Sequence, residues 1–326
     1  MSPQFVFVHG IMGAESKLPY DELARALGKR LPEAGLHLAD WRELGFTTKR
    51  PLLDIDRPFN PPLETVLRQV QPPLLSERAC VWLDILERDV CKQHPLWFPT
   101  TAMFKAELAV LRWLLDYVAD IEVYLRDDER RAAIQEYVRR IIARAAESGP
   151  TIVVAHSLGS VICHEVIHAM APDSVCLLVT LGSPLQFMLY QLHGTGLVTF
   201  GLLQHPKLDW LNVHDIKDVL ASPLVQDDFV PPRRVDFYVH WKLIEGEVGF
   251  IAFQDGRAVS FEEFWQEHCP GTGLRANVAI NRYSSALLAH QSYWQVSARY
   301  RALVETLVAY ATQLGSARSP ETRGEL

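Results

Sequence analysis

A serine near the middle of the chain lies in a pattern that is typical of a catalytic nucleophile. Residues 155–159 have the sequence Ala-His-Ser-Leu-Gly, directly after the apolar run 151–154 and before a segment with helical spacing. A serine on a tight strand-to-helix turn exposes its hydroxyl above the sheet, and small residues two positions before and after it let the two backbones approach. Ala155 takes the place of the usual first glycine and is still small. The pattern predicts that Ser157 is a nucleophile; the alternative is an ordinary helix N-cap.

A glycine-containing turn follows the first apolar run and predicts where a negatively charged oxygen would be bound. Residues 8–13 have the sequence Val-His-Gly-Ile-Met-Gly. Glycines after a strand let backbone N–H groups turn inward, so the N–H groups of Ile11 and Leu158 are predicted to converge as an oxyanion hole. The alternative is a plain glycine turn. The neighbours of these groups are the candidate substrate-binding residues: His9, Gly10, Met12 and His156.

A histidine and two aspartates supply candidates for a base and an acid. Asp215 and Asp218 follow the segment Trp-Leu-Asn-Val at 210–213, and a carboxylate just past a strand can orient a histidine. Asp218 is the preferred acid and Asp215 the second candidate. The alternative is that both are solvent-exposed aspartates of a loop with no catalytic role. His290 lies near the C-terminal end of the chain, where a loop histidine suits a general base. The alternative is a histidine that only begins the last helix.

The order serine, acid, histidine along the chain is the order found in α/β-hydrolases. Three further segments resemble lipase-like and esterase-like members: Leu-Gly-Ser-Pro at 181–184, Trp-x-Asn-x-x-Asp-x-x-Asp at 210–218 and His-x-Ser-Tyr-Trp at 290–294. The chain resembles the α/β-hydrolase superfamily over nearly all of its length. This resemblance implies that Ser157 is the nucleophile, His290 the base and Asp218 the orienting acid. It also implies cleavage of a carboxylic ester, a thioester or a lipid acyl bond through an acyl-enzyme, without a metal or an organic cofactor.

One motif competes with this interpretation. Residues 164–168 have the sequence His-Glu-Val-Ile-His, and on a helix His164 and His168 could bind zinc with Glu165 as a base. The motif lies in the helix that the serine turn opens, and no third ligand with recognisable spacing follows. On a helical wheel both histidines fall outside the apolar stripe formed by 158, 162, 166 and 169, so we expect them at the periphery. A zinc hydrolase stays an alternative function, and so does a non-catalytic, hydrolase-like binding module.

The elements that must position these residues alternate between strands and helices. This alternation predicts an α/β fold with a mostly parallel sheet and helices on both faces. The predicted strands are Phe5–His9, Leu36–Asp40, Thr151–Ala155, Val175–Leu181, Leu208–Val213 and Val235–Val239, with a hairpin around 254–256. The predicted helices are Tyr20–Leu31, Phe104–Val118, Asp127–Ala146, Leu158–Met170 and Trp294–Leu314.

Two segments interrupt this alternation. Residues 45–104 are rich in proline and carry aromatic residues, which predicts a helical cap inserted into the hydrolase domain. Residues 241–285 are less regular and are predicted to be a second insertion before His290. The whole of 1–326 is therefore expected to form a single α/β-hydrolase domain with these two insertions.

Composition limits the partners and the compartment. The 326 residues carry a net charge of −7, which argues against a nucleic-acid-binding surface. The expected partner is a small-molecule or lipid acyl substrate. Peripheral contact of the protein with lipid is a further alternative. Five cysteines without a paired spacing indicate reduced thiols. No export signal and no transmembrane segment is recognisable, so we expect a cytoplasmic protein; secretion by another route stays open, as do the oligomeric state and the choice between hydrolase and acyltransferase.

Overall fold

A sheet of nine strands forms the centre of the part of the chain that the computed structural model describes. That part comprises residues 1–10, 20–44, 124, 127–171, 173–185, 207–215, 218, 221, 234–238, 251–254, 257–260, 271, 273, 275–280, 290, 293 and 301–317. The chain divides into two compact units, Met1–Phe46 with Glu129–Leu326, and Thr47–Asp128. The sheet and the candidate site belong to the first unit. The predicted cap at 45–104 and the predicted helix at 104–118 lie outside the described residues and stay predictions.

The sheet is mostly parallel, which confirms the predicted α/β class. Its strands are β1 (Gln4–Val8), β2 (Gly35–Ala39), β3 (Thr151–His156), β4 (Leu177–Leu181), β5 (Asp209–Asp215), β6 (Arg234–Tyr238), β7 (Ile251–Gln254), β8 (Arg257–Ser260) and β9 (Arg275–Ile280). The order across the sheet is β2-β1-β3-β4-β5-β9-β6-β7-β8. Every pairing from β2 to β6 is parallel, while β7 and β8 are attached as an antiparallel hairpin.

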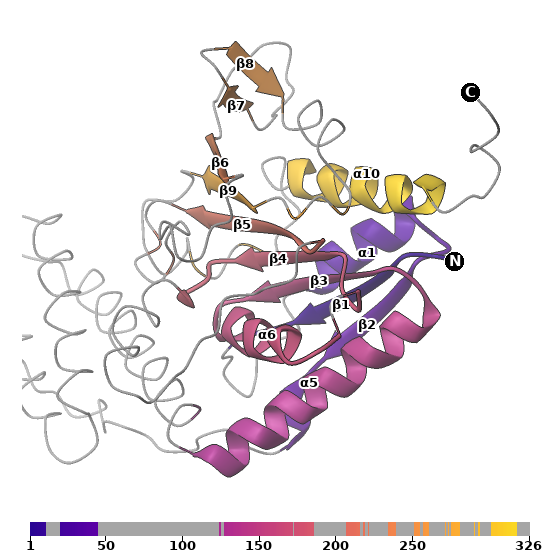
Figure 1. Cartoon of the computed structure of the whole chain (residues 1–326), viewed down its shortest axis with the longest axis vertical. Helices are drawn as coiled ribbons and strands as arrows, with labels where there is room; N and C mark the ends of the chain where they lie inside the picture. Colours follow the sequence, from indigo (N-terminus) through magenta and orange to yellow (C-terminus); the bar gives the residue numbers. More distant parts are fainter. Residues whose placement is uncertain are drawn as a thin grey trace, which may run out of the picture. The chain divides into compact units, whose positions relative to one another are not determined.

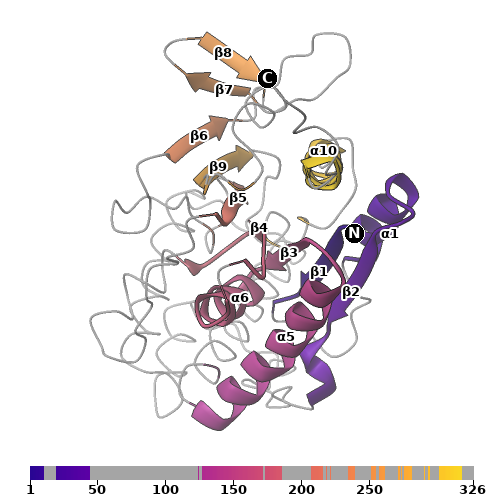
Figure 2. The same ribbon diagram turned by 45° about the vertical axis from the view of Figure 1, so that its right-hand side comes forward.

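The central strands are buried on both faces, as an uninterrupted apolar run predicts. Every residue of β1, β3, β4 and β5 is buried. Helices α1 (Asp21–Arg30) and α10 (Arg301–Ala317) cover one face, and α5 (Asp128–Ser148) and α6 (Leu158–His168) cover the other (Figures 1 and 2). The largest hydrophobic cluster lies under α1 and α10, where alternate residues of β1 and β3 meet Leu23, Leu27 and Leu307. A short 3-10 helix, η1 (Trp41–Leu44), follows β2.

The strand order reverses at β1 and β3, and this reversal defines where a ligand is expected. From β1 the chain passes through α1 to β2 on one side, whereas β3 leads through α6 to β4 on the other side. In open α/β sheets, ligands bind outside the carboxyl ends of the strands at such a switch point. Here those carboxyl ends are followed by His9 and Gly10 after β1 and by Ser157 after β3.

Strand β9 was not predicted from the sequence. It lies in the segment 241–285, which was expected to be a less regular insertion, yet it is an interior strand between β5 and β6. Its Asn277 is buried and accepts a hydrogen bond from Asn212 Nδ2 at 3.0 Å. Thr180 Oγ1 in turn donates to Asn212 Oδ1 at 2.8 Å, so buried polar side chains connect β4, β5 and β9. The hairpin expected around 254–256 is confirmed by β7 and β8.

Candidate active site

Ser157 lies on the sharp turn between β3 and α6 that its sequence pattern predicts. Its φ is 55° and its ψ is −129°, and it is the one non-glycine residue with positive φ in the part of the chain that the structure describes. Such a conformation is strained and is kept only where the surroundings enforce it. The Ser157 N–H donates to Leu181 O at 3.0 Å. A Cβ atom at Gly159 would lie 2.6 Å from the carbonyl oxygens of both Val8 and His9, which explains why a small residue must stand two positions after the serine.

Gly10, two residues after the end of β1, lies directly against the serine. A Cβ atom at Gly10 would lie 2.5 Å from Ser157 Cβ and 2.9 Å from both Ser157 Oγ and His156 O. Only glycine allows this approach. The two segments that were predicted to form an oxyanion hole are therefore adjacent at the switch point. Leu158 begins α6 there, while Ile11 and Met12 lie outside the described residues and keep their roles as predictions.

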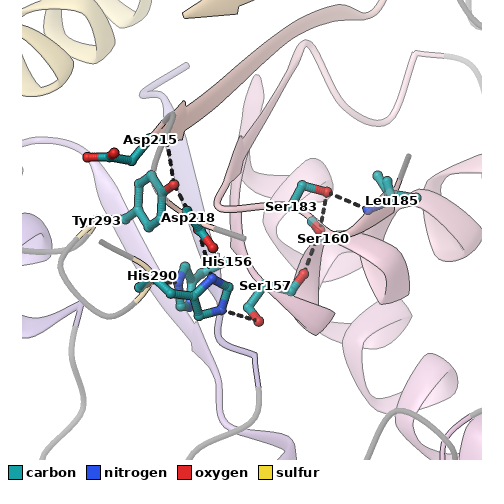
Figure 3. A network of polar contacts seen from close by, with 9 residues as sticks. All are labelled: His156, Ser157, Ser160, Ser183, Leu185, Asp215, Asp218, His290 and Tyr293. Atoms are coloured by element: carbon teal, nitrogen blue, oxygen red, sulfur yellow. Dashed lines mark hydrogen bonds and ion pairs between the residues drawn. The ribbon is translucent and has the colours of Figure 1, made fainter. Parts of the chain in front are cut away.

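His290 connects the serine to an aspartate, although the three residues come from distant parts of the chain. Its Nε2 atom lies 2.9 Å from Ser157 Oγ, and its Nδ1 atom lies 2.8 Å from Asp218 Oδ2 (Figure 3). When Nδ1 carries the imidazole proton and donates it in a hydrogen bond to the carboxylate, Nε2 has the lone pair that can accept the serine proton. All three side chains are buried. This is the geometry that nucleophilic catalysis by a serine requires.

The structure distinguishes the two candidate acids. Asp218 lies on a turn just after β5, where its N–H donates to Asp215 O at 2.9 Å and its carbonyl accepts from the Ala221 N–H at 3.2 Å. This turn brings the Asp218 carboxylate to His290. Asp215 is the last residue of β5, and its carboxylate points away from His290 (Figure 3). The preferred acid is thus the one that contacts the imidazole.

Tyr293 is a further buried residue of the site that was not assigned a role from the sequence. Its hydroxyl donates to Asp218 Oδ2 at 2.9 Å and accepts from the Asp215 N–H at 2.7 Å. Its ring occupies the space beside Gly182, where a Cβ atom would lie 2.5 Å from Tyr293 Cε2. Gly182 also has a positive φ of 57°. The Leu-Gly-Ser-Pro segment after β4 therefore needs its glycine for both backbone conformation and room for the tyrosine.

Two other serines support the carbonyl group of Ser157. Ser160 Oγ donates to Ser157 O at 2.5 Å, and the Ser160 and Ser183 hydroxyls are 2.6 Å apart. The Leu185 N–H donates to Ser183 Oγ at 3.3 Å. The turn after β4 is thereby tied to the first turn of α6 (Figure 3). Sequence spacing gives no signal for this contact, because Ser160 and Ser183 belong to different elements.

His156, a candidate substrate-binding residue, is held against the base. Its Nε2 donates to the backbone carbonyl of His290 at 2.8 Å, and the centroids of the two rings are 5.0 Å apart. Its ring also lies against Tyr293, with centroids 5.7 Å apart. Burial, followed by the proximity of His290, lowers the pKa of His156 well below its ordinary value. His156 is therefore neutral, and the contacts in this structure assign it to the support of the His290 backbone.

His9, a second candidate for substrate binding, is fully buried beneath the turn after β1. Its Nε2 lies 2.9 Å from Asp40 Oδ1, and its ring stacks against Trp41 with centroids 5.1 Å apart. The Trp41 indole N–H donates to the His9 carbonyl at 3.1 Å. These contacts fasten the His9–Gly10 peptide to the end of β2. His9 supports the turn, and Gly10 is the residue of the pair that meets the nucleophile.

The two histidines of the competing motif differ in burial. The expectation that His164 lies at the periphery is wrong, because it is 1% exposed and its ring packs against Trp210 with centroids 5.7 Å apart. A helical wheel that counts only apolar residues as buried does not predict the burial of a histidine that packs on a tryptophan. His168 is exposed, as expected. The Glu165 carboxylate accepts from Arg131 and, at 2.9 Å, from Gln135 Nε2, so it serves the contact between α5 and α6.

Comparison with known proteins gives no relative from which a function can be transferred. No protein-family model, no curated protein and no solved structure matches this chain. The described residues contain no helix long and apolar enough to cross a bilayer. They also contain no cluster of three or more histidine, cysteine, aspartate or glutamate side chains placed to hold a metal ion.

Proposed function

We propose that this protein is a serine hydrolase of the α/β-hydrolase type that cleaves a carboxylic ester, a thioester or a lipid acyl bond. The observation that supports this most is the position of His290 between Ser157 Oγ and Asp218 Oδ2, at 2.9 Å and 2.8 Å. The strained turn at Ser157 and the location of the site at the switch point of the sheet support it further.

The first half of the proposed reaction forms an acyl-enzyme. Ser157 Oγ attacks the carbonyl carbon of the substrate while His290 Nε2 takes the hydroxyl proton. Asp218 accepts a hydrogen bond from the Nδ1–H group and stabilises the imidazolium that forms. In this proposal the backbone N–H groups of Leu158, the first residue of α6, and of Ile11 stabilise the negative oxygen. His290 then protonates the leaving alcohol or thiol as its bond to the acyl carbon breaks.

The second half releases the acyl group. A water molecule attacks the acyl carbon, His290 takes one of its protons, and the bond from Ser157 Oγ to the acyl carbon breaks. The proton returns to Ser157 Oγ, and the carboxylic acid leaves. An acyltransferase would follow the same course with an alcohol, thiol or amine in place of water.

The decisive experiment uses a fluorophosphonate probe, which reacts with activated serines. We expect the wild-type protein to be labelled, with the adduct on the peptide that contains Ser157, and Ser157→Ala to lose both labelling and turnover. Loss of a triad member typically lowers kcat by about 10⁴-fold to 10⁶-fold. Ser174→Ala is a matched control, because Ser174 precedes β4 at the end of that strand opposite the site. Turnover by Ser157→Ala within tenfold of wild type would refute the proposal.

The substrate class is then defined with a series of chromogenic esters of increasing acyl length. A maximum at short chains indicates an esterase, and a maximum at long chains indicates a lipase. Turnover is expected to persist after treatment with a chelator. Turnover that disappears with the chelator and returns with zinc, while His290→Ala stays active, would instead assign the reaction to the helix that carries His164 and His168.

A further inference from the structure

The acid of the candidate triad accepts two hydrogen bonds on one oxygen. Asp218 Oδ2 lies 2.8 Å from His290 Nδ1 and 2.9 Å from the Tyr293 hydroxyl. A carboxylate keeps an imidazole in its catalytic orientation only if the carboxylate is itself held. Its contact with His290 cannot supply that restraint, because His290 is the group to be oriented. Tyr293 donates to the same oxygen and can supply such a restraint.

The hydroxyl of Tyr293 is fixed by its own contacts. It accepts the Asp215 N–H at 2.7 Å, so its proton is directed at Asp218. The Tyr293 ring packs against Gly182, where a Cβ atom would lie 2.5 Å from Tyr293 Cε2. It also packs against the His156 ring, with the two ring centroids 5.7 Å apart. The phenol therefore has little freedom to rotate away. A buried phenylalanine would fill nearly the same volume, so packing alone does not explain the hydroxyl.

The same contacts join the two loops that carry the acid and the base. Tyr293 follows His290 by three residues, and Asp218 follows Asp215 by three residues. The Tyr293 hydroxyl bonds to both members of the second pair. The Tyr293 hydroxyl thus links the part of the chain that carries His290 to the part that carries Asp218 (Figure 3). This link holds acid and base near each other although they lie far apart in the sequence.

We propose that Tyr293 is a positioning residue of the catalytic site, which holds the Asp218 carboxylate in place so that Asp218 can orient His290. This inference rests on the proposed serine hydrolase function. The Tyr293 ring lies edge-on to the His290 ring, with centroids 6.4 Å apart, and a phenylalanine would keep this contact. The hydroxyl acts through the acid. Its loss should therefore lower kcat and leave KM unchanged.

The test compares Tyr293→Phe with Tyr310→Phe. Tyr310 is also fully buried, and its hydroxyl lies 2.9 Å from the carboxylate oxygen Asp209 Oδ2 and 2.9 Å from Cys176 O. Both variants thus remove a hydroxyl from a buried carboxylate, and only one of the carboxylates belongs to the candidate site. We expect kcat of Tyr293→Phe to fall by about tenfold to a hundredfold, the worth of a hydrogen bond to a charged group, with KM within about twofold. Tyr310→Phe should keep the wild-type kcat.

A second readout reports the hydrogen bond itself. The Nδ1 proton of His290 is buried between two side chains, and proton NMR should detect it as a low-field resonance in the wild-type protein. In Tyr293→Phe the resonance should broaden or disappear through faster exchange with water, while in Tyr310→Phe it should persist. If Tyr293→Phe does not fold, 4-fluorophenylalanine at position 293 fills the volume of the hydroxyl without donating a proton.

The outcomes separate this inference from the proposed function. A kcat for Tyr293→Phe within twofold of that for Tyr310→Phe, with the His290 resonance unchanged, would refute the positioning role. If the wild-type protein neither hydrolyses esters nor reacts with the fluorophosphonate, the proposed function fails. The NMR comparison would then still decide whether Tyr293 holds Asp218 against His290.

Discussion

Gly10→Ala is the substitution that tests most directly whether the turn after β1 lies over the nucleophile. The added methyl carbon would lie 2.5 Å from Ser157 Cβ, and an ordinary contact begins at 3.4 Å, so the two groups must separate by about 0.9 Å. Gly10 has no positive φ, so this contact is the main consequence of the change. The His9 side of the turn resists the displacement, because His9 is bonded to Asp40 and its carbonyl accepts from Trp41.

Most of the movement therefore falls on Ser157. A displacement of this size would take Ser157 Oγ from 2.9 Å to beyond hydrogen-bond range of His290 Nε2. A misplacement of about 1 Å in an active site costs on the order of 100-fold in rate. Overpacking of a buried contact also destabilises the fold by about 1–3 kcal/mol. We expect kcat/KM to fall by about 100-fold while the protein stays folded.

The assay combines kcat/KM on the best ester with the rate of fluorophosphonate labelling and the melting temperature. Gly315→Ala is the matched control: a Cβ atom there meets nothing within 4 Å, and the residue lies in helix α10. It should keep wild-type activity and stability or gain slightly in stability. Activity of Gly10→Ala within tenfold of wild type would show that the turn does not restrict Ser157 and would refute the reasoning.

Two other predictions concern the acid and the pH dependence of stability. Asp218→Asn should lower kcat/KM by about 10⁴-fold because an amide does not stabilise the imidazolium, whereas Asp215→Asn should cost much less; the opposite ranking would make Asp215 the acid. Folding lowers the pKa of His156, so below about pH 6.5 the unfolded chain binds a proton there that the folded protein does not, and stability falls as the pH falls. His156→Gln, which keeps an amide donor for the His290 carbonyl, should make the slope of unfolding free energy against pH shallower in acid by up to about 1.4 kcal/mol per pH unit, as measured by urea denaturation at stepped pH. An unchanged slope would contradict the neutral, buried state of His156. His168→Gln is the control for the loss of an exposed imidazole, at the far end of α6.

The sequence predicted the parts of the fold that burial determines. Strands β1, β3 and β4 are covered on both faces, so their residues form mostly apolar runs that stand out from the rest of the chain. The strand-to-helix turn at Ser157 has a local signature for the same reason, since close packing requires small neighbours. The need for a histidine as base and a carboxylate as acid, each near the end of a strand or in a loop, limited the candidates to a few residues. The choice between Asp215 and Asp218 depended on a turn whose direction spacing alone does not give.

The features that the sequence did not reveal depend on partners far along the chain. Strand β9 carries the buried Asn277, whose partner is Asn212, and this polar residue interrupts the apolar run by which an interior strand is recognised. The role of the Tyr293 hydroxyl depends on its hydrogen bond to Asp218, which lies 75 residues earlier in the chain. The burial of His164 likewise depends on Trp210. Such contacts are properties of the assembled sheet and leave no local pattern.

The place of β9 in the sheet has a consequence for how the chain folds. Strand β5 ends at Asp215 and its neighbour β9 begins at Arg275. During synthesis, one edge of β5 therefore stays unpaired until the ribosome has added β9. Strand β9 then has to enter between β5 and β6, two strands that precede it, and such non-local pairing is slow. An unpaired strand edge invites association with other chains, which makes this interval the stage most exposed to aggregation. Because His290 follows β9 in the chain, His290 can join Ser157 and Asp218 only after β9 has been synthesised, and a chain that ends before it lacks the candidate site.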